Sequence, residues 1–191
     1  MKKKILYIAV LAICLSILTG GTLAYYTASD TARNVITSGS VSVQVRQYQR
    51  IGDTLQPFPS QPIPVMPGTT VSKIVTVESM EQAAWIRVNF SVTVYDSAGN
   101  QMEITPEEQA SLIAISPDEE NWMWKDGWWY YKAPVDSGEE TLPLFESVSF
   151  SGPGMGNQYQ RCSIIIDITA QGVQKANNGE SVMDAMGWPE S

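Results

Sequence analysis

The chain has 191 residues, of which 12 are Lys or Arg, 20 are Asp or Glu and none is His, and its formal net charge at pH 7 is −8. An acidic surface repels phosphate backbones, which argues against nucleic-acid binding. The absence of histidine from the sequence excludes His-based triads, Cys–His pairs and the His-Glu-x-x-His zinc helix. We therefore expect no cofactor and no metal site.

The first 24 residues have the organisation of a secretory signal peptide. Three lysines at 2–4 precede an apolar run at 5–18, and small residues follow. A membrane anchor needs about 20 apolar residues, so we expect cleavage and release, with membrane contact only through the uncleaved signal peptide. Thr22 and Ala24 supply small residues at positions −3 and −1 of a cut before Tyr25; a cut after Tyr25 is the alternative.

Removal of residues 1–24 leaves 167 residues, enough for one domain with a hydrophobic core. Three of the 12 basic residues leave with this segment, so the charge of the remaining chain is 9 − 20 = −11. Cys162 then has no intrachain partner, and its position in an alternating apolar run predicts a buried thiol. We divide the chain into a signal peptide (1–24), a mature N-terminal segment (25–40), a β-sandwich domain (41–176) and a C-terminal tail (177–191).

Alternating apolar residues predict strands along most of the mature chain. Val41, Val43 and Val45 share one face of the first strand, and further strands are expected near 71–77, 86–94, 146–150 and 162–170. Five prolines within 55–68 indicate an extended connection outside any central ladder.

A short inserted helix is predicted from 105 to about 112. Thr105 is a suitable N-cap, Pro106 occupies the first helical position and Glu108 the third. The acidic cluster at 118–120 lacks the spaced oxygen ligands of a calcium loop, and we interpret it as a solvated face. Short alternating strands joined by Gly, Pro and Asp turns favour an all-β fold, an antiparallel β-sandwich.

The most distinctive internal segment is aromatic and spans residues 122–131. Its Asp-Gly pair at 126–127 predicts a two-residue hairpin turn, which places Trp124 opposite Trp129 and Trp122 opposite Tyr131. Cross-strand aromatic pairs stabilise a sheet by roughly 0.2 to 1 kcal/mol each, so the structural interpretation is packing. The functional interpretation is a face that stacks on sugar rings or on a neighbouring subunit.

Two N-terminal motifs resemble a known family. GGTLAYYT at 20–27 and NVITSGSV at 34–41 are similar to the signature of the TasA and camelysin family, secreted proteins of Gram-positive spore-forming bacteria and their relatives, processed by a SipW-type signal peptidase. Weaker similarity comes from the segments at 67–68, 126–131, 141–145 and 173–174. Ala28, Ser29 and Ile36 depart from the usual pattern, in which an acidic residue and Phe are common.

The resemblance implies a jelly-roll-like sandwich and a non-enzymatic, secreted subunit of biofilm matrix fibres. In such fibres the mature N-terminal segment of one copy completes the sheet of the next, so the partners are the chain itself, the signal peptidase and an accessory or anchoring matrix protein. Residues 25–40 are polar enough to move, and the following valines offer an apolar row for strand addition. The candidate assembly residues are Tyr25, Tyr26, Val35, Ile36, Val41, Val43 and Val45.

Two other function classes remain open from the sequence. One is a monomeric cell-surface or matrix module that binds glycans or a partner protein through Trp122, Trp124, Trp129 and Tyr131. The other is a secreted hydrolase built on carboxylates. Nothing in the spacing of Asp118, Glu119, Glu139 and Glu140 selects an acid and base pair, so we expect no enzymatic activity.

Overall fold

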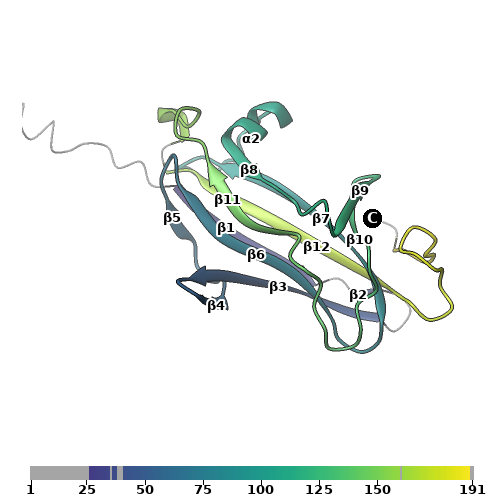
Figure 1. The fold of residues 1–191 in the computed structure, drawn as a ribbon. Helices are drawn as coiled ribbons and strands as arrows, with labels where there is room; N and C mark the ends of the chain where they lie inside the picture. The colour runs from purple at the N-terminus through teal and green to yellow at the C-terminus, as the bar shows by residue number, and fades with distance from the viewer. Residues whose placement is uncertain (1–25, 35, 38–40, 160, 190–191) are drawn as a thin grey trace, which may run out of the picture.

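The computed structural model describes residues 26–34, 36–37, 41–159 and 161–189, with the side chains of 26–40 and of Asn157 left undescribed. The chain folds into two β-sheets that enclose a shared core, with one short helix at one end (Figure 1). The predicted all-β, mainly antiparallel sandwich is thus confirmed. Its elements are β1 (Tyr26–Asn34), β2 (Ile36–Thr37), β3 (Val41–Ile51), β4 (Thr54–Pro57), β5 (Ile63–Val65), β6 (Thr70–Ser79), β7 (Ala84–Tyr95), α2 (Pro106–Leu112), β8 (Ile113–Ile115), β9 (Trp122–Lys125), β10 (Trp128–Tyr131), β11 (Phe145–Phe150), a 3₁₀ turn (Asn157–Tyr159) and β12 (Ser163–Gln174).

The first sheet has the strand order β5-β1-β12-β7-β10-β9, and the second has the order β2-β3-β6-β11-β8 with β4 attached to β3. Strands β1 and β12 run parallel, while the other pairings in the described chain are antiparallel. The longest ladder joins β7 to β12, from Tyr95 opposite Ser163 to Ala84 opposite Gln174. Strand β12 therefore lies inside the first sheet, between β1 and β7.

The predicted alternation of apolar residues matches the burial seen along β12. Ile164, Ile166 and Ile168 are buried in the core, whereas the residues between them are partly exposed. Cys162 is also fully buried and unpaired, as predicted, and burial raises the pKa of its thiol. A thiol held in this protonated form behaves as a small apolar side chain rather than as a nucleophile.

The proline-rich segment, predicted as an extended connection outside any central ladder, contains two short strands. Strand β4 pairs with β3, and β5 pairs with β1 at one margin of the first sheet. Proline has no backbone N–H to donate, so it is tolerated on a strand that is paired along one side only. Pro57 and Pro64 both occupy such strands.

The predicted helix is confirmed as α2. The Thr105 hydroxyl accepts a hydrogen bond from the backbone N–H of Glu108 at 3.2 Å, and Pro106 is the first helical residue. The helix ends at the buried Leu112 and continues directly into β8. No helix in the part of the chain that the structure describes is long and apolar enough to cross a membrane.

The two sheets approach each other closely at Gly172 of β12. A Cβ atom added there would lie 2.6 Å from Cγ1 of Val43 and 3.1 Å from Cγ1 of Val41, both on β3. Such distances are shorter than van der Waals contact, so only glycine fits without displacing β3. Gly172 thereby sets the spacing between the sheets at this end of the sandwich.

We expect Gly172→Ala to destabilise the protein by about 1–3 kcal/mol, because the added methyl group overpacks the space between β12 and β3. The free energy of unfolding is measured by urea denaturation followed through tryptophan fluorescence. Gly152→Ala is the matched control, since its Cβ would come no closer than 3.5 Å to another atom. Equal effects of the two substitutions would contradict the close-approach explanation.

Candidate functional site

The N-terminal segment contributes an interior strand of the first sheet. Strand β1 pairs in parallel with β12, from Thr27 opposite Ser163 to Asn34 opposite Ala170, and its other edge pairs with β5 near Ala28. Of the predicted cleavage and assembly residues, Thr22, Ala24, Tyr25 and Val35 lie outside the described part of the chain. Tyr26 begins β1, and Ile36 lies in β2 opposite Ser42 of β3.

The three valines predicted to help assembly lie instead inside the sandwich. Val41, Val43 and Val45 are buried in the core on β3, which pairs with β6. Their apolar row packs against β12, where Gly172 makes room for it. These side chains are therefore already covered within one subunit, and they add no free apolar face for a neighbour.

The aromatic hairpin forms with the predicted turn and register. Asp126 and Gly127 both have positive φ, 48° and 83°, as a two-residue type I′ turn requires. Trp124 pairs with Trp129 and Trp122 pairs with Tyr131. Strand β10 continues the first sheet from β7, which leaves β9 as the outermost strand.

One end of this aromatic face is buried. The side chain of Trp122 is only 1% exposed, and its ring lies 5.0 Å from that of Tyr131. The Trp122 indole N–H donates to the carbonyl oxygens of Leu142 and Pro143 at 3.3 and 3.2 Å, and the Tyr131 hydroxyl accepts from the Leu142 N–H. Trp122 and Tyr131 therefore anchor the hairpin to the core.

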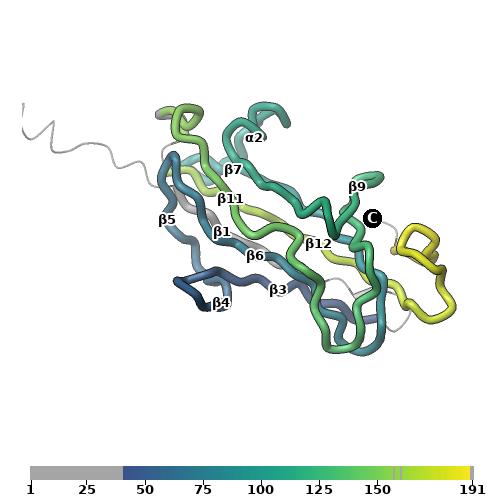
Figure 2. Tube along the Cα trace, in the orientation of Figure 1, coloured from purple at the N-terminus to yellow at the C-terminus, as the bar shows by residue number. Residues whose placement is uncertain are grey.

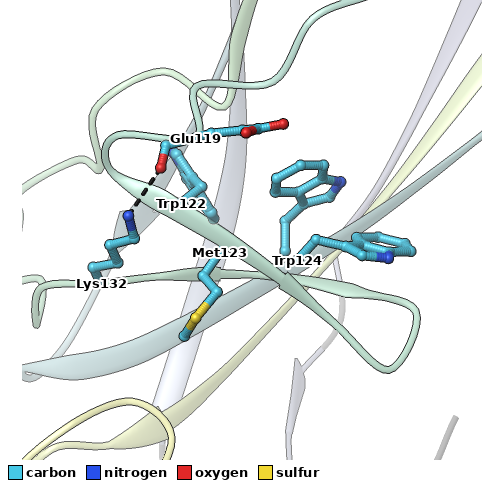
Figure 3. A pocket seen from close by; sticks show the side chains of 6 residues that line it. Glu119, Trp122, Met123, Trp124 and Lys132 are labelled. Carbon is cyan, nitrogen blue, oxygen red and sulfur yellow. Dashed lines mark hydrogen bonds between the residues drawn. The ribbon is translucent and has the colours of Figure 1, made fainter.

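The other end of the face is accessible at the edge of the sheet. Trp124 is 54% exposed, and its ring lies 5.3 Å from the half-buried ring of Trp129. Beside them is a pocket of about 320 Å³ (Figure 3). It is lined by Glu119, Trp122, Met123, Trp124, Trp129 and Lys132. The Lys132 ammonium donates to the backbone carbonyls of Glu119 and Glu120, both at 2.8 Å, and so fixes the rim of the pocket.

The acidic cluster before the hairpin shapes a turn. The Asp118 carboxylate accepts hydrogen bonds from the side chain of Asn121 at 2.7 Å and from the backbone N–H groups of Glu120 and Asn121. These bonds, that of the Asn121 side chain above all, lower the pKa of Asp118. Within the described ranges, no group of three or more His, Cys, Asp or Glu residues is placed to hold a metal ion.

The opposite face of the hairpin carries an arrangement that sequence reasoning missed. Arg87 on β7 is only 9% exposed. Its Nε and Nη2 donate to Oε1 of Gln171 at 2.8 and 2.6 Å, Nη1 donates to the Tyr130 hydroxyl at 3.1 Å, and Nη2 also donates to the carbonyl oxygen of Pro189 at 3.0 Å. The acceptors in these four bonds are all uncharged.

Aromatic rings stabilise this buried cation. The guanidinium carbon of Arg87 lies 4.3 Å from the ring centre of Trp128, 4.8 Å from that of Trp188 and 5.9 Å from that of Tyr130. The negative face of an aromatic ring attracts a cation, and the attraction is stronger when water is excluded. Strict alternation along β7 already placed Arg87 on the face away from the core, but no local signal indicated that the tail would cover it.

The C-terminal tail packs over this outer face of the first sheet, beside β10 and the end of β12 (Figure 2). Asn178 fixes the conformation of the tail through three hydrogen bonds of 3.0 Å. The backbone carbonyl oxygen of Asn178 accepts from the Trp85 indole N–H, and its side-chain amide donates to the backbone carbonyls of Gln174 and Met186. The buried residues of this second apolar cluster are Trp85, Trp128, Tyr130, Val173, Val182 and Ala185.

No model of a known protein family and no curated protein matches this sequence. Two features of the described chain nevertheless have chemistry suited to recognition. One is an N-terminal strand inserted into the interior of a sheet. The other is a pair of accessible tryptophans at a sheet edge.

We expect Arg87→Lys to destabilise the protein by about 2 kcal/mol, because an ammonium cannot reproduce the planar fork that bonds Gln171 and stacks on Trp128. Urea unfolding gives the free energy change. Arg46→Lys is the matched control: Arg46 pairs with Glu78 near the surface, where an ion pair contributes up to about 1 kcal/mol. A loss at Arg46 as large as that at Arg87 would contradict the role of the aromatic surroundings.

Proposed function

We propose that this protein is a secreted, non-enzymatic structural subunit of extracellular matrix fibres, of the kind that the TasA and camelysin family comprises. Its N-terminal strand joins copies together by entering the first sheet of the next subunit. In this proposal the sandwich is jelly-roll-like, and a SipW-type signal peptidase removes residues 1–24 before assembly. An accessory matrix protein anchors the fibre.

The observation that carries the proposal is the position of β1. The strand pairs with β12 from Thr27 to Asn34 and with β5 at Tyr26–Ala28, although it belongs to the first part of the mature chain. Only residues 35–40, which include β2, separate it from β3 in the core of the sandwich. The same site in the sheet can therefore accept β1 from its own chain or from a second copy.

Magnitudes favour a joint made by the backbone. Because Val41, Val43 and Val45 are already buried, the ladder between β1 and β12 must supply much of the attraction. About eight ladder hydrogen bonds at roughly 1 kcal/mol each are comparable with the approximately 4–15 kcal/mol that association costs. Exchange between copies preserves these bonds, so protein concentration decides between the closed monomer and the fibre.

A disulfide between register partners tests the proposal without removing β1. Thr31 of β1 lies opposite Asp167 of β12. In the chain beginning at Tyr25, carrying Thr31→Cys and Asp167→Cys, we expect oxidation under filament-forming conditions to give a ladder of covalent multimers on a non-reducing gel. Negative-stain electron microscopy of the same sample should show filaments.

Each single-cysteine variant is a control for random crosslinking through the introduced thiols or through Cys162. Filaments accompanied only by internally crosslinked monomer would contradict strand addition, because β1 would then have stayed in its own subunit. A chain lacking residues 25–36 should form no filaments, and intact assembly of that variant would equally overturn the mechanism.

A second candidate function is a surface or matrix module that binds glycans or a partner protein through the hairpin. The pocket of about 320 Å³ beside the exposed Trp124 favours it. The binding face is then restricted to Trp124 and Trp129, since Trp122 and Tyr131 are buried. Unchanged binding to matrix polysaccharide after Trp124→Ala and Trp129→Ala would eliminate this function.

A further inference from the structure

A second pocket, of about 300 Å³, opens on the outer face of the first sheet. It is lined by Asn89, Trp128, Thr169 and Gln171. The register of β12 against β7 brings these residues together, because Thr169 of β12 pairs with Asn89 of β7 and Gln171 pairs with Arg87. Trp128 and Trp129 are adjacent on β10 and point to opposite faces of the sheet, so this pocket is distinct from the one at the hairpin edge.

Gln171 is the unusual member of this lining. It is only 4% exposed, and its Oε1 accepts two hydrogen bonds from Arg87. A guanidinium has donors and no acceptor, so the carbonyl oxygen of the amide must face Arg87 and its NH₂ group must face away. That NH₂ group has no acceptor among the residues that the structure describes. A bound molecule or water can supply the acceptor for a buried donor of this kind.

The other lining groups have complementary chemistry. The Asn89 side chain donates through Nδ2 to the carbonyl oxygen of Gly127 at 2.6 Å, which leaves its Oδ1 as an acceptor. Thr169 adds a hydroxyl group, and Trp128, which is only 9% exposed and stacks on the guanidinium of Arg87, adds the small part of its indole ring that lines the pocket. The pocket thus combines an apolar surface with uncharged donors and acceptors.

We infer that this pocket binds a neutral pyranose unit of a polysaccharide. A sugar ring presents C–H groups to an aromatic surface and hydroxyl groups to amides and hydroxyls, which is the combination that these four residues offer. The hydroxyl oxygens of the sugar supply the acceptor that the Gln171 amide lacks. This site is independent of fibre assembly and operates equally in a monomer.

Charge selects a neutral sugar over an acidic one. None of the four lining residues is charged, and the four hydrogen bonds of Arg87 go to groups of the protein. Asp167, two residues before Thr169 on β12, occupies the same face of the sheet and is partly exposed. Its carboxylate, together with the charge of 9 − 20 = −11 on the chain that begins at Tyr25, repels anionic polymers.

Saturation-transfer NMR on the chain beginning at Tyr25 tests this inference. The probes are the methyl pyranosides of glucose, galactose, mannose and N-acetylglucosamine, with methyl glucuronide as the charged comparison. We expect transfer to at least one neutral probe and weaker or no transfer to the glucuronide. Transfer to none of the neutral probes, or to the glucuronide alone, would overturn the proposal.

Gln171→Glu is the sharpest variant. It keeps an oxygen acceptor for Arg87 and replaces the NH₂ group that points away from Arg87 by a second oxygen, so binding should weaken at least tenfold while the melting temperature is maintained. Thr169→Val removes only the hydroxyl and serves if the first variant fails to fold. Thr93→Val, on β7 and outside the lining of this pocket, is the matched control for Thr169→Val and should leave binding unchanged. Full binding by both pocket variants, or its loss in Thr93→Val, would refute the site.

Discussion

The close contact between β12 and β3 is the constraint on which the rest of this structure depends. Gly172 lets the two strands approach to a distance that a side chain at this position would prevent. With β12 fixed there, its inward isoleucines fill the core, one edge pairs with β7 and the other pairs with β1. Its outward-facing residues include Gln171, so the same strand also positions the outer pocket.

The hairpin shows why aromatic residues alone do not define a binding face. Strand β10 lies between the sandwich core on one side and the C-terminal tail on the other. Tyr131 packs inward and Tyr130 packs outward, so both faces of the strand are covered. Of the two pockets described above, one lies at the edge strand β9 and the other on the outer face of the sheet beside Trp128.

Local signals in the sequence were sufficient for much of the fold. The strand alternation, the Thr105 cap and the Asp-Gly turn depend on neighbouring residues, and each formed as predicted. Burial of Trp122 and the contacts of Arg87 depend instead on segments far along the chain: the Pro189 carbonyl that Arg87 contacts is 102 residues away. No periodic pattern in the sequence predicts a contact between segments so far apart, so the buried Arg87 and the pocket beside it are apparent only in the three-dimensional structure.

The pairing of β1 with β12 also has a consequence for the order of folding. Thr27 and its partner Ser163 are 163 − 27 = 136 residues apart, so β1 is synthesised early while its partner is among the later segments to appear. Contacts between such distant segments close large loops and form slowly. The first sheet therefore passes through a period with an open edge on β12, during which a strand from another molecule competes directly with the chain's own.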